Sequence, residues 1–394
     1  MKSYWFSTFV KLFLGSVVCL CAYWPIRWWM NEFHLFLFVL TLIFASVVIF
    51  QKKEVIRAVF LTLLSVSLMW VMIEYGFLIS KRFVSPHAKA NKTFSCGASK
   101  PMGRRDVELG YRGVPGPVVC TSKLFRGQDD VHQSTYTLDE HGFRVTPETN
   151  KHGAGILFFG GSNMVGELVN DHETLPYYVS QRLNHRYNIV NLGWSGWGPH
   201  QMLRILETGI VSDVLKGSLR GAVLKTAIWH TQRVLGYSFW DQQGPKYERQ
   251  ANGGVSYSGP FKTDGRLALE KRLKQSHLIN WILQRTQTIS SGDIELYIDV
   301  VVSASALLQE QYGVPLTILF MPSPDLPEGY GGYTDQMVIQ RLRQEGLTVL
   351  KGSDVIADYQ APEMMVEGDG HPTPIVYNLE SKLVASFFQE QDKK

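Results

Sequence analysis

Long apolar runs occupy the first eighty residues of the chain, and shorter ones alternate with polar segments in the remainder. Residues 4–24, 33–50 and 58–79 form three apolar runs that are almost free of charge. Each is close to the roughly 20 residues that cross a bilayer as a helix. The pattern predicts a transmembrane region over residues 1–80 that contains three helices and places the chain in a lipid bilayer.

Basic residues around these runs predict an orientation. Five of them lie before the first run, inside it or between the second and third, namely Lys2, Lys11, Lys52, Lys53 and Arg57. Only Arg27 lies between the first and second runs. The positive-inside rule then predicts a cytoplasmic N-terminus and an external location for everything after Ser80, although Lys81, Arg82, Lys89 and Lys92 argue the other way. We expect a bacterial inner-membrane protein whose C-terminal domain is periplasmic or extracellular.

From about residue 152 onward, apolar strand-like runs alternate with helical stretches. The expected strands are 156–160, 188–192, 222–229, 316–321 and 348–350. The expected helices are 175–185, 200–211, 277–288, 294–312, 335–345 and 375–389. Such alternation predicts an α/β domain, residues 152–394, with a mainly parallel sheet covered on both faces. A Gly- and Gln-rich insertion without a clear period spans about 235–272, and residues 81–151 read as a β-rich external collar.

Charge and motif content exclude several classes of protein. Residues 81–394 contain 33 basic and 32 acidic side chains and no basic patch, so a nucleic-acid partner is not expected. The chain has no His-Glu-x-x-His sequence, no clustered Cys/His spacing and no phosphate-binding or dinucleotide fingerprint. We therefore expect neither a metal nor a cofactor.

The soluble part has two cysteines, Cys96 and Cys120, in a Gly/Pro-rich segment. In an exported domain they are candidates for one disulfide, and the alternative is a pair of free thiols.

A candidate nucleophile lies in the stretch from Gly155 to Glu167. An uncharged run ends in Gly160-Gly161, and Ser162 follows at the sharp turn. Open α/β sheets place their chemistry at this end of a central strand. The simpler alternative is a Gly-Ser loop that merely ends the strand.

A candidate base lies near the end of the chain. His371 is flanked by Gly370 and Pro372 and follows Asp369 by two residues. A serine hydroxyl is a poor nucleophile until an imidazole accepts its proton, and a carboxylate holds that imidazole in the right tautomer. The alternative is a turn in which Asp369 caps the last helix and His371 is a surface residue.

Taken together, these blocks resemble the SGNH/GDSL hydrolase superfamily. The first is Gly160-Gly161-Ser162-Asn163, with Gly161 where an Asp is usual, the second Asn191 to Gly196, and the last Asp369 to Pro372. The resemblance covers about residues 152–394 and implies a three-layer α/β/α, flavodoxin-like fold. It further implies Ser162 as nucleophile, His371 as base, Asp369 as orienting acid, and an oxyanion hole from the amides of Ser162 and Gly196.

Two departures from the family pattern stand out. No Asn follows the third strand, where the sequence reads Ile228 to Arg233. Either His230 or Gln232 donates to the oxyanion instead, or this contact is absent. The acid precedes the histidine by two residues where three is commoner, which is similar to the membrane-associated polysaccharide O-acetylation branch. Glu367 remains an alternative orienting acid.

Several residues near the expected strand ends are candidates for substrate binding. Trp194, Trp197 and Trp229 would stack on a sugar, and packing against neighbouring loops is the alternative. Asn163 and Glu167 would line the pocket, and helix-start capping explains them equally well.

The sequence and the resemblance together predict a membrane-anchored serine esterase or O-acyltransferase. Its substrate would be an acylated small molecule or an envelope or secreted glycan, with acetyl the leading acyl group and acyl-Ser162 the intermediate. Three helices are too few to suggest acyl transport, so a transferase would need a membrane partner that supplies the acyl donor. The alternative from another class is a non-catalytic glycan-binding or assembly subunit with a degraded site.

Overall fold

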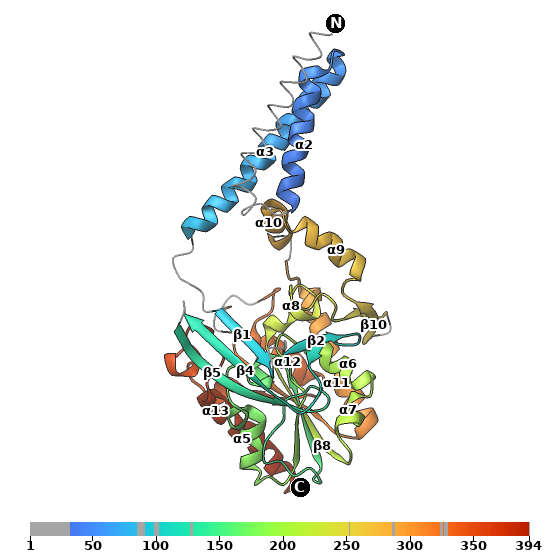
Figure 1. The fold of residues 1–394 in the computed structure, drawn as a ribbon. Helices are drawn as coiled ribbons and strands as arrows, with labels where there is room; N and C mark the ends of the chain where they lie inside the picture. The colour runs from blue at the N-terminus through green and yellow to red at the C-terminus, as the bar shows by residue number, and fades with distance from the viewer. Residues whose placement is uncertain are drawn as a thin grey trace. The chain divides into compact units, whose positions relative to one another are not determined.

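The structure is a computed structural model that describes residues 32–84, 91–97, 102–126, 129–251, 253–285, 288–323, 326 and 330–393. It divides into two compact units (Figure 1). A helical unit comprises Met1–His87 and Asp264–Gln287, and an α/β unit comprises Ala88–Thr263 and Thr288–Lys394.

The helical unit contains a hairpin of two long helices. Helices α2 (Glu32–Phe50) and α3 (Glu54–Val84) are joined by three residues and pack together, with the rings of Phe44 and Phe60 5.8 Å apart. Within the described residues, Glu54–Phe77 of α3 is the one stretch long and apolar enough to cross a membrane. The apolar part of α2, Leu37–Ile49, is shorter.

The expectation of three transmembrane helices is therefore corrected. The predicted span 58–79 lies within the apolar stretch of α3, whereas the predicted span 33–50 corresponds to a helix whose apolar part is too short by the same criteria. The predicted span 4–24 lies outside the described residues.

A buried carboxylate joins α3 to the second pair of helices in this unit, α9 (Asp264–Leu273) and α10 (His277–Arg285). Glu74 is 1% exposed, and it accepts hydrogen bonds from the Ser276 hydroxyl and from the amides of His277 and Leu278 at the start of α10. A carboxylate there satisfies amides that have no partner within the helix and complements the helix dipole. The charge of Glu74, within the apolar run 58–79 of α3, thus has a structural role.

The α/β unit is built on a five-stranded, wholly parallel sheet. Its strands are β6 (Gly155–Gly160), β7 (Asn188–Asn191), β8 (Leu219–Thr226), β11 (Leu316–Phe320) and β12 (Thr348–Lys351), in the spatial order β12-β11-β8-β6-β7. This is the flavodoxin-like order, in which the chain reverses direction across the sheet between its first and third strands. The predicted strands match these to within a few residues at either end.

Helices cover both faces of the sheet, as predicted. One face carries α5 (Leu175–Arg182) and α13 (Pro374–Gln391), and the other carries α6 (Pro199–Glu207), α7 (Ile210–Val214), α8 (Thr231–Val234), α11 (Ser291–Tyr312) and α12 (Asp335–Gln344) (Figure 1). Shorter turns of helix are α4 (Ser162–Val165), η1 (Asp171–Glu173), η2 (Ile228–His230), η3 (Gly352–Asp354) and η4 (Pro362–Met364).

Side-chain alternation along the strands separates the two cores. In β6, Ile156 and Phe158 pack with α5 and α13, whereas Leu157 and Phe159 pack with α6 and α11. Successive residues of a strand face opposite sides, so an unbroken apolar run buries both faces. This arrangement gives the three α/β/α layers.

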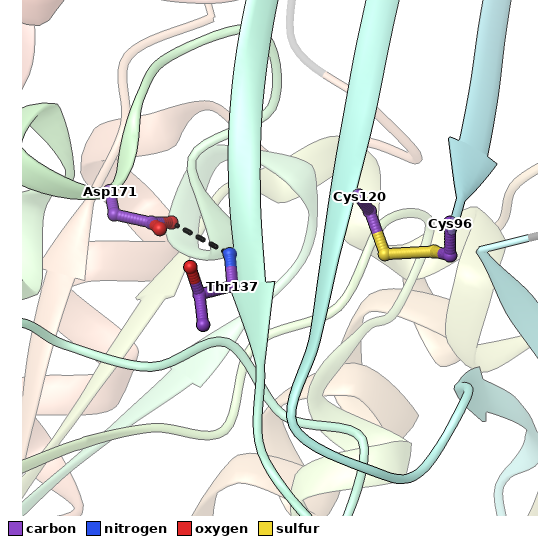
Figure 2. Close-up of a disulfide and its surroundings, with 4 residues drawn as sticks. All are labelled: Cys96, Cys120, Thr137 and Asp171. Carbon is purple, nitrogen blue, oxygen red and sulfur yellow. Dashed lines mark hydrogen bonds between the residues drawn. A yellow bond between two sulfur atoms is a disulfide. The ribbon is translucent and has the colours of Figure 1, made fainter. Parts of the chain in front are cut away.

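The collar is a regular antiparallel structure. Strands β1 (Asn91–Cys96), β4 (Val118–Arg126) and β5 (Asp129–Leu138) form a three-stranded sheet, and β2 (Gly103–Asp106) pairs with β3 (Gly110–Gly113). Cys96 and Cys120 lie directly opposite each other on β1 and β4 and form a disulfide (Figure 2). The same view shows the carboxylate of Asp171 accepting a hydrogen bond from the amide of Thr137 on β5, 3.2 Å away. The collar is thus fastened to the loop between β6 and α5.

The predicted insertion at 235–272 contains two different structures. Strands β9 (Pro245–Arg249) and β10 (Val255–Pro260) form a hairpin within the α/β unit. Helices α9 and α10 pack with α2 and α3 instead, so the chain leaves the α/β unit after Thr263 and returns to it at Thr288. This excursion could not be predicted from sequence patterns, because the contacts that hold it are made by residues about two hundred positions upstream.

Candidate functional site

Ser162 lies where the first strand of the sheet ends, beside the point at which the strand order reverses. Two glycines make the turn. Gly160 has φ +153°, and a Cβ there would be 2.8 Å from the Lys225 carbonyl oxygen. A Cβ on Gly161 would overlap the Arg233 guanidinium and lie 2.8 Å from the Trp197 carbonyl oxygen. The space beside Gly161, where the resembled family has an Asp, is therefore filled here by the guanidinium of Arg233 from α8.

Ser162 is the first residue of α4, with Gly161 as its N-cap. As a glycine, Gly161 has no side chain that could cap the amides of the first turn. Among the described residues, no backbone carbonyl is recorded as an acceptor for the amide of Ser162 or for that of Gly196. These two amides, predicted to bind an oxyanion, remain candidates for that role.

His371 lies on a tight loop between η4 and α13. The Val366 amide donates to the His371 carbonyl at 2.7 Å, and Gly368 and Gly370 take positive φ of +80° and +86° within the turn. His371 Nδ1 is hydrogen-bonded to Asp369 Oδ1. With Nδ1–H donating to the carboxylate, the lone pair of Nε2 points away from Asp369, as a general base requires.

Asp369 is ionised under ordinary conditions. Burial opposes its charge, but the hydrogen bond and charge of His371, together with Lys92 2.7 Å away, lower the pKa of Asp369 to about 2. Glu367, the alternative orienting acid, is exposed, and it is Asp369 that contacts the imidazole.

A cleft of about 330 Å³ connects the two halves of the site. Asn163, the residue after Ser162, and Gly370 and Pro372, the residues on both sides of His371, all line it. The cleft also includes one of the three predicted tryptophans, Trp229, together with Met321, Pro322, Ser323, Leu326, Tyr359, Gln360 and Met365. The segments that carry Ser162 and His371, about two hundred residues apart in sequence, thus border one cavity.

Tyr359, in the lining of this cleft, is fixed by a buried ion pair. Its hydroxyl donates to Glu380 Oε1 at 3.0 Å, and the other oxygen of Glu380 binds Lys225, which lies on β8. Both charged side chains are completely buried. One wall of the cleft therefore rests on a fixed part of the core.

Two charged residues that sequence reasoning had not assembled lie beside the imidazole, Lys92 and Glu167, and Ser195 binds the second of them. Lys92, from β1 of the collar, forms ion pairs with Asp369 and with Glu167. The hydroxyl of Ser195, in the second block, donates to Glu167. Glu167 Oε2 is also 3.8 Å from His371 Nε2. Two carboxylates therefore flank His371, with one ammonium group between them.

The charges of this cluster are mutually stabilised. Burial works against the charge of Glu167, but His371, Lys92 and the hydrogen bonds from Lys92 and Ser195 lower its pKa. Burial likewise disfavours the charge of Lys92, and the two carboxylates raise its pKa. Glu167 had been weighed as a pocket or capping residue, whereas Lys92 had no motif to identify it and was missed.

The collar holds the loop that carries Glu167. Arg144, 2% exposed, donates to the carbonyls of Val165, Gly166 and Val169 and also pairs with Asp171. Leu168, in the same loop, has φ +64°, a conformation that is costly for a branched apolar residue. Its amide donates to the Tyr136 hydroxyl of β5 at 2.5 Å, which helps to hold this conformation.

The second block is held in a similar way. The Tyr111 hydroxyl donates to the Ser195 carbonyl at 2.8 Å, and Trp240 Nε1 donates to the Gly196 carbonyl at 3.2 Å. Gly196 has φ +80°, and a Cβ there would overlap Trp240 and lie 2.5 Å from the Tyr111 hydroxyl. Glycine is therefore required at this candidate oxyanion position.

Two of the three tryptophans predicted to stack on a sugar are core residues. Trp194 is 3% exposed and packs against Gly113 of the collar. Trp197 is 1% exposed, donates from Nε1 to the Tyr111 carbonyl and packs edge-on against Phe143. The prediction was wrong for both because the collar covers this part of the strand-end surface.

His230 does not have the arrangement expected of an oxyanion donor, which corrects that suggestion. Its ring is buried, and Nδ1 lies 3.0 Å from the Thr226 hydroxyl on β8. Burial, with smaller effects of Arg233 and His200, lowers the pKa of His230 well below its ordinary value, so the ring is neutral. Gln232, the other suggested donor, is exposed. Asn163 lines the cleft and donates from Nδ2 to Met321 Sδ at 3.1 Å.

No metal-binding group is evident in the described part of the chain. Nowhere among these residues do three or more His, Cys, Asp or Glu side chains come together as possible ligands. The cluster around His371 is hydrogen-bonded and ion-paired within itself, as described above.

The structure aligns with several solved hydrolases at low identity. A psychrotrophic esterase from Pseudoalteromonas sp. aligns with 61% of this chain and 99% of its own at 11% identity and a TM-score of 0.35. A carbohydrate esterase family 2 enzyme from Corynascus thermopiles (Myceliophthora fergusii) aligns with 78% and 88% at 15% identity and 0.35. A carbohydrate acetylesterase family member from Sinorhizobium meliloti aligns with 60% and 98% at 11% identity and 0.31. Neither the family models nor the curated proteins gave a match.

Proposed function

We propose that this chain is a serine ester hydrolase that removes O-acyl groups, with Ser162 as nucleophile, His371 as base and Asp369 as the acid that orients it. One observation carries the proposal. The residue after Ser162 and both neighbours of His371 line a single cleft at the reversal point of the sheet, and His371 there has Nδ1 bonded to an ionised Asp369.

The reaction would follow the usual two steps of a serine esterase. Ser162 Oγ attacks the ester carbonyl while its proton passes to His371 Nε2, and the oxyanion is bound by the amides of Ser162 and Gly196. The imidazolium returns the proton to the departing alcohol, leaving acyl-Ser162. Water, deprotonated by the same nitrogen, then attacks the acyl group, the bond between the acyl carbon and Ser162 Oγ breaks, and the imidazolium returns its proton to Oγ as the acid leaves.

We propose an O-acetylated glycan as substrate. The cleft is small, which suits a short acyl group such as acetyl. Its lining combines aromatic side chains, Trp229 and Tyr359, with the polar side chains of Asn163, Gln360 and Ser323. Apolar faces and amide groups side by side are what a sugar ring requires. An acylated small molecule of similar size would use the same features.

Transfer is the variant of this proposal in which a sugar hydroxyl replaces water as the second nucleophile. All the residues named would serve both reactions, because only the acceptor differs. A transferase would also need a membrane partner to supply the acyl donor.

We further propose that α3 anchors the protein in a bacterial inner membrane, with the α/β unit in the periplasm or outside the cell. The apolar stretch of α3 supports an anchor. The disulfide between Cys96 and Cys120 favours an oxidising compartment, because cytosolic proteins seldom keep structural disulfides.

Labelling with a fluorophosphonate probe tests the catalytic proposal on the full chain in detergent. The wild type should be labelled and should release acetate from p-nitrophenyl acetate, and Ser162→Ala should do neither. Ser212→Ala, on α7, is the matched control and should be labelled like the wild type. A folded wild type that is neither labelled nor active would instead favour a non-catalytic glycan-binding or assembly subunit.

An acceptor distinguishes hydrolysis from transfer. The same assay would be run with and without a soluble oligosaccharide, with the products identified by mass spectrometry. Acetylated sugar as the product, with turnover stimulated by the acceptor, would establish transfer. Unchanged turnover with free acetate alone would establish hydrolysis.

A further inference from the structure

We propose that Lys92 is a positioning residue of this site: its ammonium group holds Glu167 away from His371 Nε2, so that this nitrogen is left for Ser162. The inference rests on the proposed function, since it assigns Nε2 the role of base. Under this proposal the candidate active site needs a residue from strand β1 of the collar in addition to the residues supplied by the α/β sheet.

The contacts of Glu167 carry the argument. Its side chain is 7% exposed, so its charge must be balanced by protein groups. Lys92 binds Oε1 and the Ser195 hydroxyl binds Oε2. With both oxygens engaged, Oε2 stays 3.8 Å from His371 Nε2, beyond hydrogen-bond distance.

Removing Lys92 changes what Glu167 must pair with. The buried carboxylate would keep the Ser195 hydroxyl but would lose its cation. The nearest group able to become one is His371, through Nε2. An imidazolium bound there to Glu167 could neither accept the Ser162 proton nor face the hydroxyl, so the base would be blocked.

The charged groups around the imidazole are consistent with this role of Lys92. Asp369 lies on its own loop, Glu167 on the loop after α4 and Lys92 on β1, and Lys92 Nζ is 3.5 Å from His371 Nδ1. An ammonium group only donates, and Nδ1–H is directed at Asp369, so this contact is electrostatic. Two carboxylates favour the imidazolium, and the ammonium offsets one of them.

A control residue lies on the same sheet. Lys92 pairs with Leu124 across β1 and β4, and Leu124 packs on Leu168 and Val366 beside the site. Lys123 is the next residue of β4 and pairs with Thr93, so its side chain faces the other side of the sheet. Lys123→Met removes the same charge from the same collar without touching the cluster.

The experiment compares full-length Lys92→Met, Lys92→Arg, Glu167→Gln, the double variant Lys92→Met/Glu167→Gln, and Lys123→Met. For each we would measure the pH profile of kcat/KM for p-nitrophenyl acetate. We would also titrate the His371 ring by NMR on protein with ¹³C-labelled histidine, with its signal identified by its loss in His371→Gln.

We expect Lys92→Met to move the acid limb of the profile and the ring titration to higher pH by about one unit, and to lower kcat/KM at pH 7 by about tenfold. Glu167→Gln should move both to lower pH, and the double variant should lie between the two. Lys92→Arg should retain most of the wild-type behaviour, and Lys123→Met all of it.

The proposal is overturned if Lys92→Met, shown to be folded, titrates like the wild type. It is also overturned if Lys92→Met and Lys123→Met lose activity equally with no displacement along the pH axis, since that marks a purely structural role. A ring titration that moves as expected in a wild-type background without esterase activity would retain the placement of Lys92 and reject the proposed function instead.

Discussion

Among its described residues, the α/β unit contains two histidine–aspartate pairs, which differ in exposure and in the ring nitrogen that binds the carboxylate. His371 binds Asp369 through Nδ1, beside a cleft, with its side chain 20% exposed. His200 binds Asp241 through Nε2 at 2.8 Å, and both side chains are completely buried. Within the described part of the chain, the remaining atoms of the second pair, His200 Nδ1 and Asp241 Oδ1, have no hydrogen-bond partner. Of the two pairs, only His371–Asp369 lies beside a cleft with its other ring nitrogen, Nε2, left for a reaction.

The buried pair, His200–Asp241, holds a loop of the candidate site in place. Gln201 Nε2 donates to Asp241 at 2.7 Å, and Gln201 Oε1 accepts from the Gly198 amide at 2.8 Å. The pair thereby fixes the end of the loop that carries Ser195 and Gly196. One dyad performs the proposed chemistry, and the other keeps the candidate oxyanion loop in place.

The largest expected effect is on activity and separates the two histidines. His371→Gln should lower kcat/KM for an ester about a thousandfold or more, because Ser162 loses its base, while the melting temperature changes little. His200→Gln should keep kcat/KM within a few-fold once it is corrected for the folded fraction. Equal losses in the two variants would show that the exposed pair has no special role.

The next largest effect is on stability, and here the buried pair should matter more than the exposed one. Asp241→Asn should lower the free energy of unfolding by about 3 kcal/mol, because it weakens a pair that water cannot reach. Asp369→Asn, at the partly exposed pair, should cost much less in stability and much more in rate. Urea unfolding monitored by circular dichroism, alongside ester turnover, checks both halves of this expectation.

Acid should act on the exposed pair over a defined range. The pKa of Asp369 is about 2 in the folded protein and lies below its ordinary value of 3.8, so the folded state binds this proton less readily than the unfolded chain. Its contribution to stability is therefore present above about pH 4 and is lost as the pH falls toward 2. The difference in melting temperature between wild type and Asp369→Asn should shrink over this range, and a constant difference would contradict the assignment.

The smallest expected effect concerns the cleft beside His371. Trp229→Ala should raise KM for an acetylated sugar several-fold with little change in kcat, because the ring lines the cleft without touching the reacting atoms. Phe239→Ala is the control, since Phe239 is 79% exposed and does not line the cleft. Steady-state kinetics would give kcat and KM for both variants. A fall in kcat for Trp229→Ala would contradict a role limited to substrate binding.

Sequence patterns predicted the parallel sheet well because its strands are short apolar runs that end in Gly, Pro or polar residues. The same reasoning proposed Ser162, Asp369 and His371 as site residues, since each lies in a recognisable local block at a strand or loop end. Lys92 escaped it because its role comes from a collar strand seventy residues before Ser162 and has no local signature. Trp194 and Trp197 were misjudged for a related reason: the collar residues that bury them, Gly113 and Tyr111, cannot be paired with them from sequence alone.

The excursion of the chain at Asp264–Gln287 determines how the protein can be divided. Three crossings of the backbone, rather than one, join the two units, so a single cut near residue 87 does not separate them. A fragment that starts after that cut would retain α9 and α10 but would lack Glu74, which receives the amides at the start of α10. It would also expose the apolar side chains that pack there, such as Trp281 against Phe77. A well-behaved soluble version requires two changes at once: removal of the N-terminal helices and replacement of residues 264–287 by a short polar connection.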